Sequence, residues 1–406
     1  MLDQTPYVSS TARRRTMSRR IVFLGCIYQL LSIPQSFGAE WYVEPLVTAT
    51  YEVNDNRSLT TAPHRAVHGH ILDAGIKTAV NTESSEWQLI PRIFVSRYSD
   101  SKNIDSNDYY VDGRYAYSSE REQVSISAGT SRNTTLTTQS TDIGLVDKNV
   151  PRRAWNAHPS WEYQLSERST IGFDTAQEVV TYGGTTVTSL VDSTYRTTGV
   201  FTRYAMSERA RLGVTLYGAR LDAPEIQNIS NDQGAQLTAN YQSSETGTLS
   251  LRYGYRRTEY SLHSGLNLIQ GASHGNVIGF THRYDGERRG FNSAIERSIN
   301  PNGFGFLVET RQVKLGFIEH YASRLTFTAD VLAFRNRSLD ARLISDDRDY
   351  MRLSGAANYQ LTPWWSMGVT LNYTKQKFTY LPQAAQSRAV LFTLSYNGAR
   401  WAGGNL

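Results

Sequence analysis

Much of this chain alternates apolar and polar residues with a period of two. Successive side chains of a β-strand point to opposite faces, so this pattern predicts strands with one apolar and one polar face. No run of 18 or more apolar residues occurs, and the sequence therefore predicts no transmembrane helix. In residues 248–256 one face carries Leu249, Leu251, Tyr253 and Tyr255, and the other carries Ser250, Arg252, Gly254 and Arg256.

The alternating segments recur along the whole chain after residue 40. They predict about 18 antiparallel strands, an even number that leaves both chain ends on one side of a membrane. A count of 16 is the alternative, because 66–80, 191–206 and 305–321 have ambiguous parity. The predicted strands are 41–53, 66–80, 86–98, 107–118, 122–132, 153–165, 169–182, 191–206, 210–221, 234–242, 248–260, 273–284, 291–299, 305–321, 325–337, 349–361, 365–377 and 387–396.

Two kinds of connection separate these strands. One kind is short and follows an aromatic residue, as in YQLSERSTIGF at 163–173, YAMSERARLGV at 204–214 and YQLTPWWSMGV at 359–369. Tyrosines at such turns suit the aromatic girdle of a membrane interface. The other kind is longer and polar, and it alternates with the short turns along the chain. One connection in this series, 300–304, is short. The long connections are 54–65, 99–106, 133–152, 183–190, 222–233, 261–272, 338–348 and 378–386.

Short turns on one side and long loops on the other are typical of bacterial outer-membrane barrels. Hydrocarbon cannot satisfy a free strand edge, so such a sheet has to close. We therefore predict an all-β, transmembrane, antiparallel up-and-down β-barrel over residues 40–406. The rival fold is a soluble propeller or β-helix, whose blade signatures are missing from the sequence.

Residues 1–39 read as a signal peptide. Arg13, Arg14, Arg15, Arg19 and Arg20 precede an apolar core at 21–33, and small residues at Ser36 and Gly38 suit cleavage after Gly38 or Ala39. Met17 is an alternative start. A short buried helix and a lipidated Cys26 are the competing interpretations, and only five apolar residues separate Cys26 from Arg20.

Cleavage would remove most of the net positive charge. Residues 1–39 contain five arginines and one aspartate, so the formal net charge falls from +5 to +1. The basic pI of 9.1 thus belongs mainly to the signal peptide, and the mature chain gives no support for nucleic-acid binding.

The chain resembles a known family in one phrase and in its turns. Residues 51–59 (YEVNDNRSL) leave the first strand through an Asp-Asn dipeptide, and the aromatic-Leu-Ser-x-Arg turns recur after it. In these features it resembles a family of outer-membrane β-barrel porins associated with extracellular-polysaccharide secretion systems. The resemblance implies an outer-membrane location and an export or channel role, and it supplies no catalytic motif.

The sequence gives little sign of an active site. His68 and His70 could bind a metal from one face of a strand, but no third ligand is near in sequence. His158 and Ser160 share the polar face of a strand, as expected by chance among many serines. No nucleophile elbow, phosphate loop or paired-cysteine spacing occurs. We therefore predict no enzyme activity, no cofactor and no metal.

Charges on the polar parity are the candidate functional residues. If the apolar faces point to lipid, acids predominate inside the barrel before residue 180 and arginines between about 200 and 285. Opposed arcs would create a transverse field in the pore, whereas the simpler alternative is that unlike charges pair. The pore-lining candidates are Arg203, Arg211, Arg252, Arg256, Arg283, Glu44, Asp112, Glu162, Asp174 and Glu178.

Three hypotheses follow. The first is a channel or export pore for a polar solute such as a saccharide, linked by the resemblance to extracellular-polysaccharide secretion. The second is a non-conducting structural or assembly barrel that docks secretion partners or surface polysaccharide. The third and weakest is a barrel enzyme. The expected partners are outer-membrane lipid and lipopolysaccharide, the barrel-assembly machinery, and a polysaccharide or small polar solute.

Overall fold

The structure, a computed structural model, describes residues 39–61, 64–99, 102–138, 149–183, 190–264, 267–340 and 347–403. The predicted signal peptide and Cys26 lie outside the described residues, apart from Ala39. None of the helices in the described ranges is long and apolar enough to cross a membrane. The strands are β1 (Glu40–Asn54), β2 (Val67–Asn81), β3 (Ser85–Tyr98), β4 (Ser106–Ser118), β5 (Glu122–Thr134), β6 (Pro151–Gln164), β7 (Ser169–Tyr182), β8 (Ser193–Ala205), β9 (Ala210–Ala223), β10 (Asn228–Gln242), β11 (Gly247–Ser264), β12 (Asn267–Asp285), β13 (Arg289–Pro301), β14 (Leu307–Ala322), β15 (Leu325–Ser338), β16 (Arg348–Gln360), β17 (Trp365–Phe378), β18 (Ala385–Asn397) and the short β19 (Trp401–Gly403).

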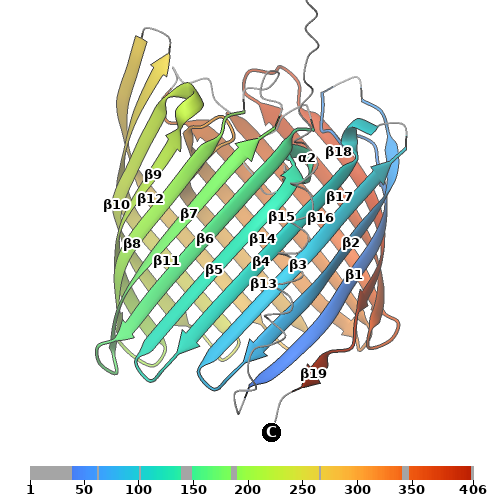
Figure 1. Cartoon of the computed structure of the whole chain (residues 1–406), viewed down its shortest axis with the longest axis horizontal. Coiled ribbons are helices and arrows are strands. Elements are labelled where there is room, and N and C mark those ends of the chain that lie inside the picture. The colour runs from blue at the N-terminus through green and yellow to red at the C-terminus, as the bar shows by residue number, and fades with distance from the viewer. Residues whose placement is uncertain are drawn as a thin grey trace, which may run out of the picture.

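The strands form one closed antiparallel barrel (Figure 1). Each strand from β1 to β18 pairs with the next, and β1 closes the sheet by pairing with β18 over Leu46–Asn54. β19 continues the line of β18 after a break and pairs with Trp41–Val43 of β1. The predicted 18-stranded barrel is confirmed, and the alternative of 16 strands is excluded.

The two rims of the barrel differ as predicted. Connections at the lower rim of Figure 1 are short turns such as 165–168 and 206–209, and both the start of β1 and β19 lie there. We assign this rim to the periplasm. The penultimate residue of each even-numbered strand from β4 to β18 is a tyrosine, and together they form the predicted interfacial girdle: Tyr117, Tyr163, Tyr204, Tyr241, Tyr284, Tyr321, Tyr359 and Tyr396.

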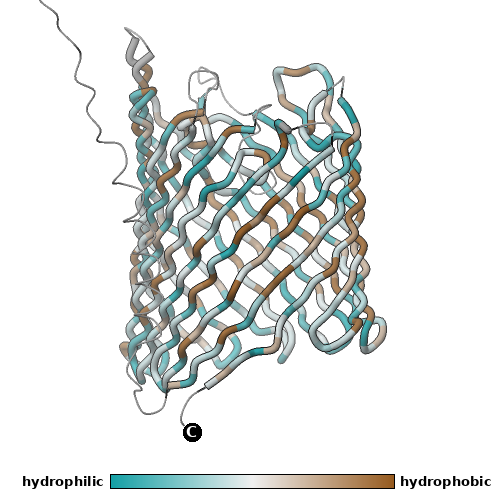
Figure 2. Tube along the Cα trace, turned by 45° about the vertical axis from the view of Figure 1, so that its right-hand side comes forward, coloured by the Kyte–Doolittle hydropathy of each residue, from teal (hydrophilic) through white to brown (hydrophobic). Residues whose placement is uncertain are grey.

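Alternation in the sequence becomes alternation across the barrel wall. Hydrophobic and hydrophilic positions succeed one another along the strands in Figure 2. Large apolar side chains on the outer parity are widely exposed, such as Leu251 (48%), Leu237 (60%) and Leu371 (58%). In water such exposure would be unfavourable, but in hydrocarbon it is the stable arrangement. The outer face therefore forms an apolar belt for lipid.

Buried clusters lie near the upper rim, where loops fold inward. Leu59 of the first long loop packs against Tyr350, Phe378 and Ala385. Leu136 of the short helix α2 (Thr135–Thr138) packs with Val67, Tyr98 and Ile104, the last in the 3₁₀ turn η1 (Lys102–Ile104). These small cores hold the extracellular ends of the strands and the loops together.

Strands β12 and β13 are paired over only part of their length. Their ladder covers only Ile278–Asp285 and Gly290–Arg297. Beyond the Ile278–Arg297 pair, the β11–β12 hairpin continues upward without β13 and rises above the rim at the upper left of Figure 1.

Two predicted loops are partly strand. Residues 222–233 contain the 3₁₀ turn η3 (Pro224–Ile226) and the first residues of β10, and 261–272 continue the β11–β12 hairpin. At these upper ends both strand faces carry polar residues, for example Asp232 inside and Asn231 outside. Because apolar and polar residues do not alternate in these two segments, the sequence predicted loops there.

Candidate functional site

The inner parity of the barrel is polar, and it forms the candidate site. On β11, Leu251, Tyr253 and Tyr255 are exposed on the outer face, whereas Arg252 and Arg256 belong to the opposite parity. Every predicted pore-lining residue lies on this inner parity, as its strand register requires. The site is thus the lumen wall, and its chemistry depends on which side chains meet across the strands.

Glycines on the inner face create room for long polar side chains of the next strand. A Cβ at Gly279 would lie 3.1 Å from Nε of Arg252, and one at Gly129 would lie 2.7 Å from Oδ1 of Asp112. A Cβ at Gly199 would likewise lie 3.1 Å from Oδ1 of Asp174. Charged side chains therefore lie flat over neighbouring glycines, along the wall.

One row of directly opposed residues runs across seven strands, and we call it the arginine rung. It begins at Arg203 on β8 and has Arg252 at its centre on β11. From there it continues through Gly279 to Glu296 on β13 and ends at Gln312 on β14. The full row is Arg203, Gly213, Thr238, Arg252, Gly279, Glu296 and Gln312.

Carboxylates accompany both arginines of this rung. Nη1 of Arg203 donates to both carboxylate oxygens of Glu162 at 2.9 and 2.8 Å. Nη2 of Arg252 donates to Oε1 of Glu296 at 2.6 Å, and Nε2 of Gln312 donates to Oε2 of the same carboxylate at 2.8 Å. Acids and arginines are therefore neighbours on the wall, which matches the simpler pairing alternative for these residues.

A hollow in the wall lies along the arginine rung. Its volume is about 520 Å³, and its lining includes Asp174, Arg203, Arg252 and Glu296 together with Thr238 and other small polar residues. The side chains of Arg203 and Arg252 keep 44% and 37% of their surface exposed. Both guanidinium groups can therefore still contact a solute from the lumen.

The remaining acidic candidates lie in separate places. Glu44 is opposite Lys77 near the periplasmic end of β1 and β2, and Glu178 accepts a hydrogen bond from Arg152 at 3.2 Å. Asp112 lies over Gly129 on β4 and β5. The structure brings only Glu162 and Asp174 of the predicted acids close to the arginine rung.

The other arginines do not form one cluster. Arg211 is exposed and lies opposite Asn240, one same-face step from the level of Arg252. Arg283 lies near the periplasmic end and pairs with Asp285 at 2.5 Å. From the sequence, Arg211, Arg252 and Arg256 share the inner parity, and strand tilt would allow the three to lie near one depth.

Arg256 differs from that expectation. It lies four residues from Arg252, which corresponds to about 13 Å along a strand. Only 2% of its surface is exposed, and it donates to Oγ1 of Thr258 at 2.7 Å and contacts Glu309 at 3.5 Å. Arg256 is thus held within the wall network, and Arg203 takes its place beside Arg252.

Two buried residues, Glu52 and Tyr98, and the half-buried Arg57 form a triad at the extracellular mouth. The hydroxyl of Tyr98 donates to Oε2 of Glu52 at 2.7 Å, and Nε of Arg57 donates to the Tyr98 oxygen at 3.1 Å. Burial lowers the pKa of the Arg57 guanidinium, but the charge of Glu52 and the contact with Tyr98 outweigh it, and the net pKa is raised. The first loop is thereby fixed to the inner face of β1 and β3.

A second segment, residues 302–306, reaches across the inside of the wall, and we call it the crossing loop. It joins β13 to β14, yet the carbonyl of Gly305 accepts a hydrogen bond from Asn228 of β10 at 2.6 Å. The carbonyl of Gly303 accepts one from the backbone N–H of Val191, before β8. Oδ1 of Asn302 holds the turn by accepting from the N–H groups of Phe304 and Phe306.

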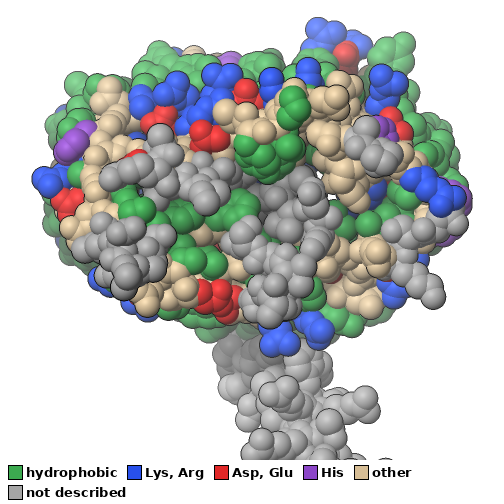
Figure 3. Space-filling view, turned by 90° about the horizontal axis from the view of Figure 1, so that it is seen from above, with side chains coloured by type: hydrophobic (Ala, Val, Ile, Leu, Met, Phe, Trp, Pro, Cys, Tyr) green, Lys and Arg blue, Asp and Glu red, His purple; other side chains and the backbone are tan. Residues whose placement is uncertain are grey.

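Together these loops narrow the entrance. In the view from above, described side chains lie inside the rim and cover part of the mouth (Figure 3). Their burial confirms the arrangement, since Leu190 and Asn302 are only 3% and 4% exposed. A solute entering from outside therefore meets a restricted opening before it reaches the arginine rung.

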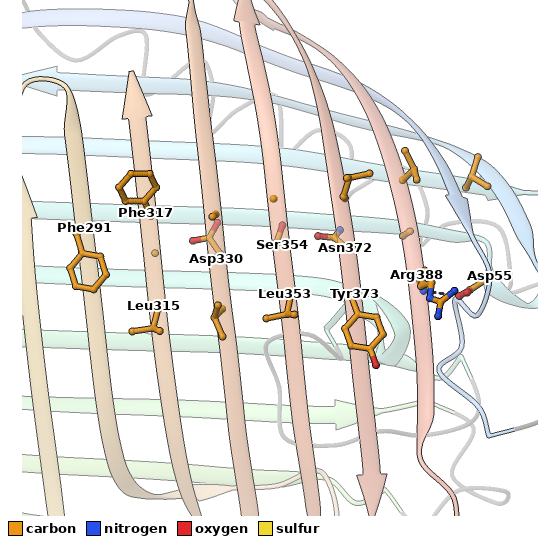
Figure 4. A pocket seen from close by; sticks show the side chains of 18 of the residues that line it. Asp55, Phe291, Leu315, Phe317, Asp330, Leu353, Ser354, Asn372, Tyr373 and Arg388 are labelled. Atoms are coloured by element: carbon orange, nitrogen blue, oxygen red, sulfur yellow. Dashed lines mark hydrogen bonds between the residues drawn. The ribbon is translucent and has the colours of Figure 1, made fainter. Parts of the chain in front are cut away.

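A separate groove lies on the outer wall. It has a volume of about 820 Å³ and is lined by Leu315, Leu353 and Leu371, with Ala329 and Gly355 at its floor. Figure 4 shows Leu315 and Leu353 on the opposite side of the sheet from Asp330, Ser354 and Asn372. This groove faces lipid, so it is separate from the lumen site.

The structure does not bring the candidate histidines and serine together as a metal site or a catalytic site. His68 and His70 occupy the outer parity of β2, and no group of three His, Cys, Asp or Glu residues in the described ranges could hold a metal ion. The hydroxyl groups of Ser160 and Ser125 form a hydrogen bond of 2.7 Å. These residues therefore give the lumen no catalytic constellation within the described chain.

Sequence reasoning missed the residues that shape the mouth. Arg57 and Asn302 lie in connections, where no periodicity marks an inward side chain. The short length of 300–304 among long polar connections was one available signal. Asn302 followed by Gly303 and Gly305 also indicates a tight turn, and Gly305 adopts a φ of +78°.

The barrel is similar to solved outer-membrane porins. Pseudomonas aeruginosa OccK2 (OpdF) has 12% identity and a TM-score of 0.46, with 87% of this chain and 98% of that chain covered. Acinetobacter baumannii OccAB4 has 11% identity, a TM-score of 0.45, and coverage of 90% and 99%. A BenF-like porin from Pseudomonas fluorescens Pf-5 has 8% identity, a TM-score of 0.47, and coverage of 89% and 100%.

No protein-family model matches the chain, and no curated protein matches it in sequence.

Proposed function

We propose that this barrel is an outer-membrane channel that passes small polar solutes carrying an anionic group. The observation that supports this most is the hollow along the arginine rung, where Arg203 and Arg252 remain partly exposed to the lumen. Guanidinium groups bind carboxylates and phosphates with two parallel hydrogen bonds. An anionic solute would thus find oriented donors on the lumen wall.

The carboxylates beside these arginines refine the proposal. Glu162 and Glu296 balance the formal charges of Arg203 and Arg252, so the wall offers alternating donors and acceptors. Such a row suits a hydroxylated solute, for example an acidic saccharide, whose hydroxyl groups can bond to the carboxylates. The attraction for an anionic group therefore rests on the partly exposed guanidinium N–H donors and not on a net positive charge of the wall.

An association with extracellular-polysaccharide secretion remains a prediction from the sequence resemblance. The second candidate, a non-conducting scaffold, is favoured by one observation. The crossing loop and the first loop occupy the extracellular mouth and are fixed by buried hydrogen bonds. A barrel sealed there would dock partners without conduction.

Planar-bilayer recording of the refolded barrel separates these candidates. We expect conductance, and in a salt gradient we expect R203Q/R252Q to shift the reversal potential toward cation preference, most strongly at low salt. The matched control is K375Q/K377Q, which removes two positive charges from the outer parity of β17. Unchanged selectivity in a conducting R203Q/R252Q barrel would contradict the role of the rung, and a wild-type barrel without conductance would favour the scaffold.

A further inference from the structure

The outer face of the barrel carries charge only near its rims. Below the extracellular ends of the strands, the outer parity is apolar, aromatic or small and uncharged from Leu212 to Gly218 on β9 and from Trp155 to Tyr163 on β6. Basic residues appear together at the upper ends, and they surround the rim when seen from above (Figure 3). The outward basic strand residues there are Arg97, Arg132, Arg153, Arg196, Arg220, Arg257, Arg297, Arg311, Arg335, Arg337, Lys375, Lys377 and Arg388.

Four pairs of these arginines are directly opposed on neighbouring strands, and one of them is Arg311 and Arg335 on β14 and β15. Arg132 faces Arg153 on β5 and β6, Arg196 faces Arg220 on β8 and β9, and Arg297 faces Arg311 on β13 and β14. Directly opposed side chains have Cβ atoms about 5 Å apart, and like charges at such positions destabilise a sheet. Each pair therefore needs a negative charge close by.

The chain itself supplies that charge for the two connected pairs Arg297/Arg311 and Arg311/Arg335. Oε2 of Glu309 accepts a hydrogen bond from Arg297 at 2.8 Å, and Oε1 accepts one from Arg311 at 2.8 Å. The same solution occurs nearby, where Asp349 binds both Arg335 and Arg337 at 2.8 and 2.9 Å. A shared carboxylate is thus how this barrel neutralises adjacent outward arginines.

The other two pairs have no such carboxylate. Arg132, Arg153, Arg196 and Arg220 are all exposed, and within the described ranges none of them has an acid within 4.0 Å. Among the described residues at the extracellular ends of these four strands, the only outward acid is Asp222, two residues beyond Arg220 on β9.

The surroundings of these two pairs are those of a lipid headgroup. All four arginines lie within three residues of the extracellular end of their strands. Directly below them the outer face is apolar, with Trp155 two residues from Arg153 and 42% exposed, and Val200 51% exposed. An anion bound here would thus have acyl chains beneath it and water above it.

We propose that the pairs Arg132/Arg153 and Arg196/Arg220 each hold a phosphate group of lipopolysaccharide in the outer leaflet. The lipid phosphate takes the place that the Glu309 carboxylate occupies between Arg297 and Arg311. A guanidinium pair offers several N–H donors to the phosphate oxygens, and the apolar belt contacts the acyl chains. This interaction is independent of conduction through the lumen.

The test is lipid binding by the full barrel in a neutral detergent, measured by native mass spectrometry. The probes are lipopolysaccharide, chemically dephosphorylated lipopolysaccharide and inorganic phosphate. The variants are R132Q/R153Q and R196Q/R220Q. The matched control is R168Q/R209Q, which removes two arginines from periplasmic turns.

We expect wild type and control to bind lipopolysaccharide at least tenfold more tightly than the dephosphorylated form, and each variant to lose that preference. Unfolding temperature gives a second readout. Without lipid, the variants should be as stable as wild type or more so, because a like-charge pair has been removed. Added lipopolysaccharide should raise the unfolding temperature of wild type and raise it less in each variant.

Three results would overturn the proposal. Equal binding of the dephosphorylated lipid would place the interaction on sugars or acyl chains. Unchanged binding by both variants would remove these arginines from the interaction. Saturation by inorganic phosphate as tight as by the lipid would make this a site for free anions.

Discussion

Arg252 and Glu296 lie on strands that are not neighbours, β11 and β13, and their side chains meet over Gly279 of β12 at 2.6 Å. The three residues are directly opposed in one row of the sheet. A side chain on the middle strand would occupy the space through which the two charged groups reach each other. The ion pair thus depends on Gly279, because a residue with a side chain would fill the space between the two charged groups.

Gly279→Val should break this pair. The new side chain would collide with Arg252, and forced overpacking of this kind typically costs about 1–3 kcal/mol. We expect lower unfolding free energy in lipid vesicles and altered conductance. Gly218→Val is the control, since a Cβ there meets no atom within 4 Å, and it should be neutral or slightly stabilising. Equal losses in both variants would argue against a specific role of Gly279.

Arginine substitutions should distinguish the two wall faces. Val369→Arg and Leu251→Arg place a charge in the apolar belt and should each cost roughly 2–4 kcal/mol near mid-membrane. Thr370→Arg and Ser250→Arg, on the adjacent inner positions, should cost much less. Denaturant titration of vesicle-inserted barrel measures the difference, and equal costs on both parities would contradict the registers.

Release of the crossing loop should change the channel. Asn228 is 1% exposed, and its side chain holds the Gly305 carbonyl. In Asn228→Ala the crossing loop loses this bond, so we expect larger or noisier single-channel currents. Asn231→Ala, on the exposed outer face of the same strand, should leave the currents unchanged. Identical recordings from the two variants would show that the bond to Asn228 does not limit conduction.

The mature chain should begin at Ala39 or Glu40. β1 starts at Glu40, directly after the predicted cleavage site, so no residue of the first strand would be lost. Mass spectrometry of the intact protein from isolated outer membranes would determine its N-terminus. Recovery of the arginine-rich residues 13–20 in that fraction would exclude cleavage.

Most of the architecture could be read from the sequence because lipid and lumen impose opposite requirements on alternate residues. The predicted strand centred on Val369 and Leu371 differs from β17 by one residue at its end. Prediction was weakest near the extracellular rim. There His68, Arg196 and Arg311 lie on the outer parity, so polar residues occur on both faces and parity becomes ambiguous.

The arginine rung could be predicted only in part. Local alternation places Arg203 and Arg252 inside the barrel, but their shared row depends on the register of four strands in succession. That register is set by turns and by pairing across the whole sheet. The burial of Arg256 was equally hidden, because its partner Glu309 is 53 residues away in sequence.

The short ladder between β12 and β13 gives the barrel a direction of least mechanical resistance. Eight residue pairs join these strands, whereas 18 join β11 and β12. We therefore expect lateral pressure from a crowded membrane to deform the barrel first along the line between β12 and β13, beyond the last residue pair at Ile278. The crossing loop begins at β13 and ends its contacts on β10, on the other side of the same line. A deformation along this line would therefore also act on the crossing loop, because its contacts join strands on both sides of the line.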